Sequence, residues 1–380
     1  MHVILDAQAI RPPLTGIGRY AFELARRIPS MDGVESLKLF RGVQLTDDVL
    51  PLLQSASGQR RLRQWIPFKP LVRRIYHGAR NAYAAHVLSR QARHSVFHEP
   101  NYILSSFDGP CVATIHDLSH IHYPAFHPAD RVDFLERELP RTLDRATHLI
   151  TVSDFVRQEM IELLGLQPER ITTVLNGVDE RFLPMPPAQT LAARRRARLG
   201  DRAYLLVVAT LEPRKNLARL LDAYLGLPPR LRQRHPLVLA GARGWHDESL
   251  SQRLDRLAES DGIIRLGFVD DEDLPALYAG AHAFAFASIY EGFGLPVLEA
   301  MACGVPVLTS STSSMPEVVG GCGLCVDPFD VDAMREGLIR LLEDETFRAF
   351  GREAGIRRAR ELGWNRCAAE TVAVYRKIAA

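Results

Sequence analysis

The sequence predicts an α/β protein made of two doubly wound domains, each with a parallel sheet between layers of helices. Short, continuous apolar runs alternate with helix-length segments along the 380 residues, which is typical of strands buried on both faces of a parallel sheet. The runs form two sets of six. Between the sets lies a proline-rich stretch with Pro184, Pro186 and Pro187, a composition that favours a linker.

The predicted strands follow one another at regular intervals in both sets. The first set covers residues 2–5, 37–40, 96–98, 111–115, 149–152 and 171–174, and the second covers 204–209, 237–240, 263–266, 283–287, 305–309 and 323–326. These positions divide the chain into an N-terminal domain (1–183), a linker (184–200), a C-terminal domain (201–363) and a last helix (364–380). The sequence of that helix does not indicate which domain it packs on.

The composition is that of an ordinary globular protein, with 47% hydrophobic and 24% charged residues. It excludes a disordered chain, a collagen and a small disulfide scaffold. A membrane span is not expected, because no apolar run reaches about 18 residues. The N-terminus MHVILDAQAI lacks a basic region and a cleavage site, so we expect no signal peptide. Five scattered cysteines fit a reducing, cytoplasmic environment.

The charge is nearly balanced overall, at +2, but residues 49–98 contain no Asp or Glu. The stretch carries nine basic residues: Arg60, Arg61, Arg63, Lys69, Arg73, Arg74, Arg80, Arg90 and Arg93. Trp65, Phe68 and Tyr76 lie among them. One interpretation is a solvated helix face. The other is a surface for anionic lipid headgroups or a phosphorylated acceptor. Nucleic acid is not expected, since no nucleic-acid-binding motif accompanies the stretch.

Two sequence features in the N-terminal half could form one wall of a site. Gly16 and Gly18, shortly after the first strand, open a helix and let the backbone approach an anion, although a plain turn is the alternative. His116 follows a strand at its carboxyl end, where open α/β sheets bind ligands. A structural histidine is the alternative there. The later histidines do not have a familiar metal-ligand spacing, so no metal site is expected.

The C-terminal half begins with a basic pair, Arg214-Lys215, directly after its first strand. An Arg and a Lys side by side at a strand-to-helix turn suit a diphosphate, because Arg binds two oxygens as a fork and Lys adds a mobile charge. The helix that follows adds its positive end. An exposed basic cap is the alternative interpretation of this pair.

The strongest motif is the segment YEGFGLPVLEAMACG, residues 290–304. Gly292 and Gly294 free backbone N–H groups to face a ligand, and a proline follows at a helix start. Glu299 lies about one turn into that helix among apolar residues, where a carboxylate needs hydrogen-bond donors such as sugar or ribose hydroxyls. Glu291 on the loop can reach the same pocket. Together with the Arg-Lys pair, these features indicate a nucleotide-sugar site.

These segments resemble the signature of the retaining family-4 glycosyltransferases. The Glu-x7-Glu stretch, LEPRKN, TVSDF, NGVD, the SSMPEV stretch and TGIGRY occur there in similar places, and the likeness runs over essentially the whole chain. Within that family the chain looks most similar to bacterial mannosyltransferases of O-antigen and capsule assembly. TGIGRY, LEPRKN and the segment His98-Glu99-Pro100-Asn101 support this narrower assignment.

The resemblance implies a GT-B fold, in which two Rossmann-like domains face each other across a cleft. It implies a nucleotide-sugar donor on the C-terminal domain, an acceptor on the N-terminal domain, no metal, and a last helix that returns to the first domain. By position, Arg214 and Lys215 match the donor-phosphate pair. Glu299 matches the ribose-binding carboxylate, and Glu291 the one that contacts the donor sugar.

The remaining matches are backbone and wall positions. Gly292, Phe293 and Gly294 match backbone donors near the sugar and phosphate, His116 with Gly16 and Gly18 matches the N-terminal wall, and His98 and Asn101 fall on the acceptor side. The chain departs from the family at Ala209-Thr210, where many members carry Gly-Arg. The first phosphate-binding Arg is therefore absent, and Arg214 is a candidate to replace it.

The resemblance predicts a cytoplasmic, membrane-peripheral enzyme that moves a hexose onto a lipid-linked glycan in surface-polysaccharide synthesis. GDP-mannose is the expected donor, with GDP-rhamnose or a UDP-sugar as alternatives on the same scaffold. Two alternatives of other classes are an NAD-dependent dehydrogenase using the first glycine loop and a non-catalytic glycan- or lipid-binding scaffold. The sequence does not identify the acceptor, the linkage or the base.

Overall fold

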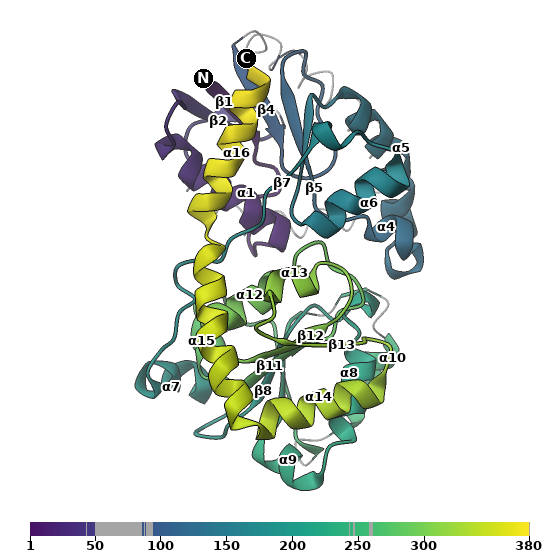
Figure 1. The fold of residues 1–380 in the computed structure, drawn as a ribbon, viewed down its shortest axis with the longest axis vertical. Coiled ribbons are helices and arrows are strands. Elements are labelled where there is room, and N and C mark those ends of the chain that lie inside the picture. The colour runs from purple at the N-terminus through teal and green to yellow at the C-terminus, as the bar shows by residue number, and fades with distance from the viewer. Residues whose placement is uncertain are drawn as a thin grey trace, which may run out of the picture.

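A computed structural model describes residues 1–379 apart from 43, 50–85, 87, 89–93, 243, 246–247 and 258–260. The described residues form two sheets, one in each lobe of the molecule, and all their strand pairs except β2–β3 are parallel (Figure 1). Every strand predicted from the sequence is present, within a few residues of its expected ends. The predicted α/β class and the pair of doubly wound units are therefore confirmed.

The N-terminal sheet has the order β3-β2-β1-β4-β5-β6-β7. Its strands are β1 (His2–Asp6), β2 (Ser36–Phe40), β3 (Leu45–Thr46), β4 (Ser95–Glu99), β5 (Cys111–Ile115), β6 (His148–Thr151) and β7 (Ile171–Thr173). The sequence analysis missed β3, which is only two residues long and pairs antiparallel with β2. The central strands of this sheet, β4 and β5, are buried along their whole length, because helices cover both faces of the sheet.

Among the described residues, the helices between the strands of this lobe include α1 (Gly16–Arg27), α4 (Ser119–His122), α5 (Ala129–Arg145) and α6 (Asp154–Leu164). Local chemistry explains two of the starts. The Thr15 hydroxyl accepts a hydrogen bond from the Gly18 N–H at the start of α1, and the Ser153 hydroxyl accepts one from Val156 at the start of α6. Both are N-caps that satisfy otherwise unpaired backbone donors.

The C-terminal sheet has the order β10-β9-β8-β11-β12-β13, and all its pairs are parallel. Its strands are β8 (Leu205–Val208), β9 (Leu237–Ala240), β10 (Ile263–Gly267), β11 (Ala283–Phe286), β12 (Val307–Ser310) and β13 (Leu324–Val326). Its helices are α8 (Leu217–Leu225), α9 (Pro229–Arg234), α10 (Glu248–Arg256), α11 (Leu274–Ala279), α12 (Leu295–Ala302), α13 (Met315–Val319), α14 (Val331–Glu343) and α15 (Glu345–Glu361).

The segment predicted as a linker, residues 184–200, is partly helical. It contains α7 (Pro187–Arg196), which starts on a proline and packs against α11 of the C-terminal lobe. Leu199 at its end is buried in the core that this lobe builds around α12. A substantial part of the segment therefore belongs to the C-terminal lobe.

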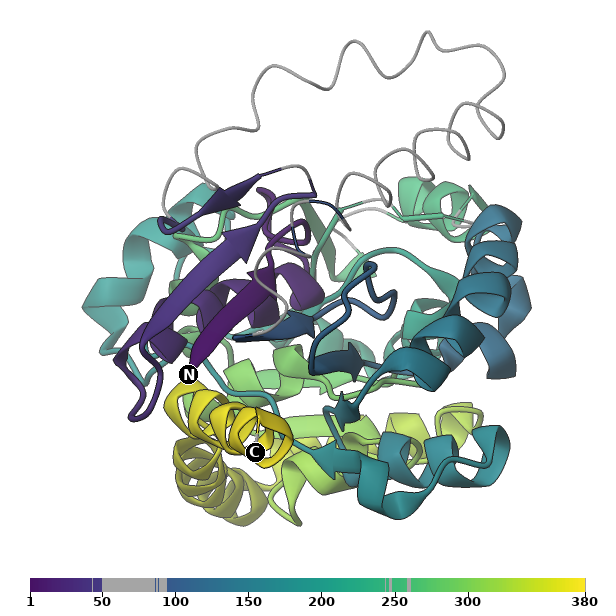
Figure 2. The same cartoon turned by 90° about the horizontal axis from the view of Figure 1, so that it is seen from above.

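The last helix, α16 (Trp364–Ala379), lies along the N-terminal lobe in both views (Figures 1 and 2). It packs against α1, and Trp364 and Tyr375 are buried in the core that includes β1. The chain thus crosses between lobes twice, and the two crossings run side by side, because Val178 N donates to Leu362 O at 3.0 Å.

Candidate active site

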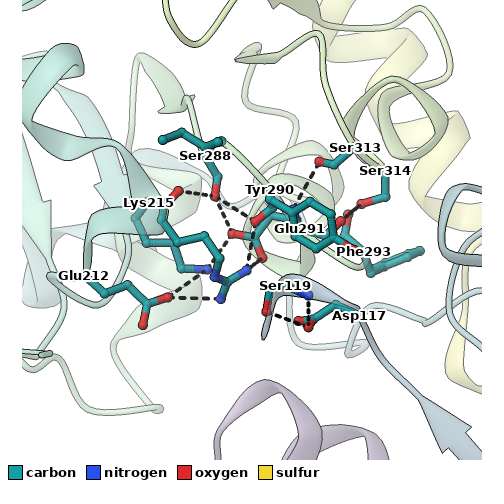
Figure 3. A network of polar contacts seen from close by, with 12 residues as sticks. Asp117, Ser119, Glu212, Lys215, Ser288, Tyr290, Glu291, Phe293, Ser313 and Ser314 are labelled. Atoms are coloured by element: carbon teal, nitrogen blue, oxygen red, sulfur yellow. Dashed lines mark hydrogen bonds and ion pairs between the residues drawn. The ribbon is translucent and has the colours of Figure 1, made fainter. Parts of the chain in front are cut away.

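The carboxyl ends of the C-terminal strands bring together the two motifs that the sequence analysis singled out. Arg214 and Lys215 form a short turn, η5 (Pro213–Lys215), after β8, and Glu291 lies on the loop after the neighbouring strand β11. Arg214 Nη1 lies 2.9 Å from Glu291 Oε2, and Lys215 Nζ lies 2.6 Å from Oε1 (Figure 3). The predicted phosphate pair is therefore already in contact with the predicted sugar-binding carboxylate.

Glu291 is held as an anion. Its carboxylate is buried, and burial alone raises a carboxyl pKa, but the charges of Arg214 and Lys215 outweigh this effect and lower the pKa of Glu291. The Ser288 hydroxyl lies 2.6 Å from Oε1 and adds a further donor. Arg214 also lies 3.0 Å from Glu212 Oε1, so both cations of the site share buried carboxylates.

Two serines hold the backbone of the same loop. Ser313 Oγ accepts a hydrogen bond from Glu291 N at 3.1 Å. Ser314 Oγ lies 2.9 Å from the carbonyl oxygens of both Glu291 and Phe293. Figure 3 shows these serines on the opposite side of the loop from Lys215. The loop is thus fixed on one side by contacts to the Glu291 side chain, and on the other side by hydrogen bonds to the backbone of Glu291 and Phe293.

The N-terminal lobe approaches this loop closely. A Cβ on Gly292 would lie 1.8 Å from the His116 carbonyl oxygen, so only glycine allows this approach. Gly294 has φ +110°, which also favours glycine, and α12 begins directly after it. The predicted glycine loop therefore lies at the meeting point of the two lobes.

His116 is buried and neutral. Its Nε2 lies 2.7 Å from the Pro100 carbonyl oxygen and must carry the proton there, which leaves Nδ1 as an acceptor. Burial lowers the pKa of His116. Asp117 beside it behaves differently. Burial raises its pKa, but the Arg214 charge and hydrogen bonds from Ser119 bring it down to about 2. The wall therefore presents one neutral imidazole and one fixed anion.

Glu299 lies on α12 in a second cluster of charges. Burial raises the pKa of its carboxyl to about 7, although the Tyr278 hydroxyl and the guanidiniums of Arg19 and Arg181 act in the opposite direction. Both guanidiniums are engaged elsewhere. Arg19 pairs with Asp271 and lies 3.4 Å from Asp179, and Arg181 lies 3.2 Å from Asp271. Glu299 is therefore poorly compensated.

The first glycine loop reaches the start of α12. A Cβ on Gly16 would lie 3.7 Å from Leu295 Cδ1, at the first residue of that helix. Arg19, one residue after Gly18, carries the ion pair to Asp271 across the lobes. Gly16 thus faces the helix that carries Glu299, whereas Gly18 packs against its own loop, where a Cβ would lie 2.7 Å from the Ala9 carbonyl oxygen.

The prediction that His98 is an acceptor-side residue is wrong. It is completely buried, with Nδ1 2.6 Å from the Tyr375 hydroxyl on α16 and Nε2 2.7 Å from the Thr114 hydroxyl. Burial lowers its pKa to about 3. Both ring nitrogens are engaged, because α16 packs on β4 and supplies Tyr375, and the neighbouring strand β5 supplies Thr114. His98 is a structural residue, whereas Asn101 is exposed just beyond the strand.

The sequence analysis missed several residues that build the site. Asp117, Glu212, Ser288, Ser313 and Ser314 all contact the loop or its cations, directly or through charge. Asp117 adjoins His116, so its place at a strand end was a usable signal. Ser313 and Ser314 lie in the SSMPEV stretch and Glu212 lies in LEPRKN, so the resemblance marked those segments, whereas Ser288 carried no signal. The nine basic residues of the acid-free stretch 49–98 lie outside the described residues.

Two family models match the chain, one on each lobe. Residues 14–182 match "Glycosyltransferase Family 4", and residues 190–358 match "Glycosyl transferases group 1". The chain is also 40% identical to the "O-antigen chain mannosyltransferase B" of Escherichia coli, and the match covers 99% of this chain and 100% of that protein.

The chain therefore belongs to the same glycosyltransferase family as the O-antigen chain mannosyltransferase B of Escherichia coli. A more distant relative is the "D-inositol 3-phosphate glycosyltransferase" of Kineococcus radiotolerans, 28% identical over 95% of this chain and 90% of that protein. Among solved structures, Anabaena HepE in complex with UDP and glucose matches with a TM-score of 0.73 at 19% identity, covering 99% of both chains. WaaG, a glycosyltransferase involved in lipopolysaccharide biosynthesis, matches with a TM-score of 0.69 at 17% identity, covering 98% of this chain and 99% of WaaG. These similarities show the GT-B fold.

The described residues contain neither a membrane-spanning helix nor a metal-binding cluster. None of the helices there is both long enough and apolar enough to cross a membrane. The same residues contain no group of three or more His, Cys, Asp and Glu side chains placed to hold a metal ion.

Proposed function

We propose that this glycosyltransferase moves mannose from GDP-mannose onto a lipid-linked glycan during surface-polysaccharide synthesis, with retention of configuration and without a metal. The observation that carries the proposal is the contact of Glu291 with both Arg214 and Lys215 beside the glycine loop. The choice of mannose is supported by the 40% identity to the E. coli O-antigen mannosyltransferase over the full length of both proteins.

The charges of the site indicate how a donor binds. Arg214 is committed to Glu291, to Glu212 and to the Tyr290 carbonyl oxygen, so its role is to hold the loop. Lys215 contacts Glu291 at 2.6 Å, lies 3.8 Å from Glu212 and lies 5.3 Å from the centroid of the Phe286 ring. We therefore assign the diphosphate mainly to Lys215 and to the positive end of the α12 dipole.

The sugar and the ribose then fall to the two glutamates. Glu291 contacts the sugar hydroxyls while its charge stays balanced by the cations. Glu299, whose carboxyl is poorly compensated, accepts hydrogen bonds from the ribose hydroxyls. The free Nδ1 of His116 accepts from a sugar hydroxyl on the N-terminal side, because Nε2 is engaged with Pro100.

The transfer itself needs no protein nucleophile. The bond between the anomeric carbon and the β-phosphate oxygen breaks, and the acceptor hydroxyl forms its new bond on the same face. The acceptor proton passes to the leaving phosphate oxygen. Charge that develops on the diphosphate is stabilised by Lys215 and the α12 N-terminus, which are in place beforehand.

The donor is tested by a thermal-shift screen with GDP, UDP, ADP and their sugars. The proposal expects the largest stabilisation from GDP and GDP-mannose, followed by mannose transfer to a lipid-linked acceptor. A larger shift from UDP-sugars would replace the donor and keep the enzyme class. A shift with NADH and none with any sugar nucleotide would contradict the proposal as a whole.

The acceptor side also carries a proposal about the membrane. Nine basic residues without one carboxylate in residues 49–98 give a local positive charge, and each exposed Lys or Arg near an anionic surface contributes about 1 kcal/mol. We therefore place the enzyme at the cytoplasmic face of the inner membrane. Vesicle co-sedimentation tests this placement. Binding that needs anionic lipid, weakens with salt and is lost on changing Arg60, Arg61, Arg73 and Arg74 to Ser supports it. Binding that ignores lipid charge refutes it.

A further inference from the structure

Helix α6 of the N-terminal lobe is contacted by the C-terminal lobe at its first turn. The Glu317 carboxylate, on α13, accepts hydrogen bonds from the backbone N–H groups of Asp154 at 2.9 Å and Phe155 at 3.3 Å. These are helix-terminal donors with no partner inside α6. The negative charge also faces the positive end of the helix. Glu317 thus caps α6 across the cleft, in addition to the local cap by Ser153.

The same helix is contacted again one turn later. The Tyr290 hydroxyl donates to Glu159 Oε2 on α6 and accepts from the Leu118 N–H at 3.0 Å. The other Glu159 oxygen lies 2.6 Å from His122 Nε2. Tyr290 is only 3% exposed. Its ring lies against the rings of His122, Tyr123 and Phe155, with centroids 5.5 to 5.8 Å apart. A side chain of the C-terminal lobe is therefore buried in the N-terminal lobe.

Both contacts lead back to the loop that carries Glu291. Tyr290 is the residue before Glu291. Glu317 follows Ser313 and Ser314 within one turn, and those serines bind the Glu291 N–H and carbonyl groups. Helix α6 thus meets the two segments that together fix the backbone of Glu291.

Plain packing between the lobes is the simpler explanation, but the chemistry argues against it. Each of the two contacts places a carboxylate in a buried or half-buried interface, where a charge is unfavourable unless it is matched by hydrogen bonds. Burial raises the pKa of Glu159 and of Glu317. Such contacts are sensitive to geometry, whereas apolar packing would hold the lobes together without fixing their register.

We propose that α6 is the docking helix for the donor loop, and that Tyr290 and Glu317 are positioning residues that couple closure of the lobes to the placement of Glu291. The inference rests on the proposed role of Glu291 at the donor sugar. GDP alone binds on the C-terminal lobe in that proposal, so loss of the docking contacts affects turnover and leaves nucleotide binding in place.

The test compares Tyr290→Phe with Tyr204→Phe. Tyr204 is a matched control, because its buried hydroxyl donates to the Leu277 carbonyl oxygen inside the C-terminal lobe. We expect Tyr290→Phe to lower kcat about tenfold or more, as for a hydrogen bond to a charged group, while the Kd for GDP stays within about twofold. Tyr204→Phe is expected to lower only the melting temperature. An unchanged kcat in Tyr290→Phe, or an equal loss of GDP affinity, would overturn the inference.

Glu317 is tested by removal and partial restoration. Glu317→Ala is expected to lower kcat, and Glu317→Gln, which keeps an acceptor oxygen for the α6 amides, to recover most of it. Combining Tyr290→Phe with Glu159→Ala is expected to cost less than the sum of the two single changes, because both remove the shared Tyr290–Glu159 bond, although each also removes a contact of its own. Additive losses in that pair would contradict the docking contact, as would equal kcat values for the two Glu317 variants.

Hydrogen exchange separates this inference from the proposed function. Backbone amides at the start of α6 are expected to exchange several-fold faster in Glu317→Ala than in the wild type, whatever the donor is. Faster exchange together with no turnover on any sugar nucleotide would leave the docking contact standing and refute the function. Normal mannose transfer with unchanged exchange and unchanged kcat in the variants would refute the inference alone.

Discussion

The two glutamates of the Glu-x7-Glu segment lie in opposite electrostatic environments. Glu291, on the loop after β11, contacts two cations, and their charge lowers its pKa. Burial raises the pKa of Glu299, on α12, to about 7, and the two guanidiniums whose charges lower it are paired with other acids. The two carboxylates of the motif therefore act in different ways. The loop carboxylate is fixed before a ligand arrives, whereas the helix carboxylate gains its partners from the ligand.

The largest effect is expected from Glu291→Ala. Loss of a preorganised group at the reacting sugar lowers kcat by about 100-fold or more. The affinity for GDP stays the same or rises, because Arg214 and Lys215 lose their anionic partner. Steady-state kinetics with GDP-mannose and calorimetry with GDP measure the two quantities. A kcat within about threefold of the wild type, in protein of normal melting temperature, would show that the loop carboxylate has no role at the sugar.

Glu299→Ala is expected to act on binding. A lost hydrogen bond between a charged group and a hydroxyl costs about 1.5–3 kcal/mol, which weakens GDP binding about 10- to 100-fold. Turnover at saturating donor falls much less, because the ribose is remote from the bond that breaks. The contact is checked by measuring how far the substitution weakens the binding of GDP and the binding of guanine, which lacks the ribose. Equal weakening for both ligands would place Glu299 away from the ribose.

The cations sharpen the same comparison. Lys215→Ala is expected to weaken GDP about tenfold and guanosine hardly at all, since a charge-assisted contact acts only when phosphate is present. Arg214→Ala also weakens GDP more than guanosine, and it lowers kcat in addition, because Arg214 holds Glu291. Calorimetry with the two ligands separates these effects. An equal loss for guanosine and GDP would mean that the pair is structural.

The smallest effect is a dependence on pH. Ligand-free Glu299 has a pKa of about 7, and hydroxyl donors favour its charged form, so binding of the ribose releases a proton near neutrality. The affinity for GDP therefore falls a few-fold as the pH drops from 8 to 6. Glu299→Gln serves as the control, because it keeps the titration of the ligand phosphate and removes that of the carboxyl. Identical pH profiles for the wild type and Glu299→Gln would contradict the raised pKa.

The sequence predicted what is local and missed what depends on distant contacts. The strands and the glycine loop follow from apolar runs and from residues next to one another. The ion pair between Arg214 and Glu291 joins the segments that follow two different strands, β8 and β11, and no sequence pattern indicates it. His98 shows the reverse error. The family resemblance placed it on the acceptor side, but α16, at the far end of the chain, covers it, and the Tyr375 hydroxyl of that helix bonds its Nδ1.

The direct test of the assignment of Glu299 to the ribose and Glu291 to the donor sugar is calorimetry with GDP alone on the wild type, Glu291→Ala and Glu299→Ala. GDP contains the ribose and the diphosphate but no donor sugar, so it engages only the groups assigned to the nucleotide. The account predicts at least about a tenfold loss of affinity for Glu299→Ala and none for Glu291→Ala. A greater loss for Glu291→Ala than for Glu299→Ala would reverse the two assignments and contradict the account.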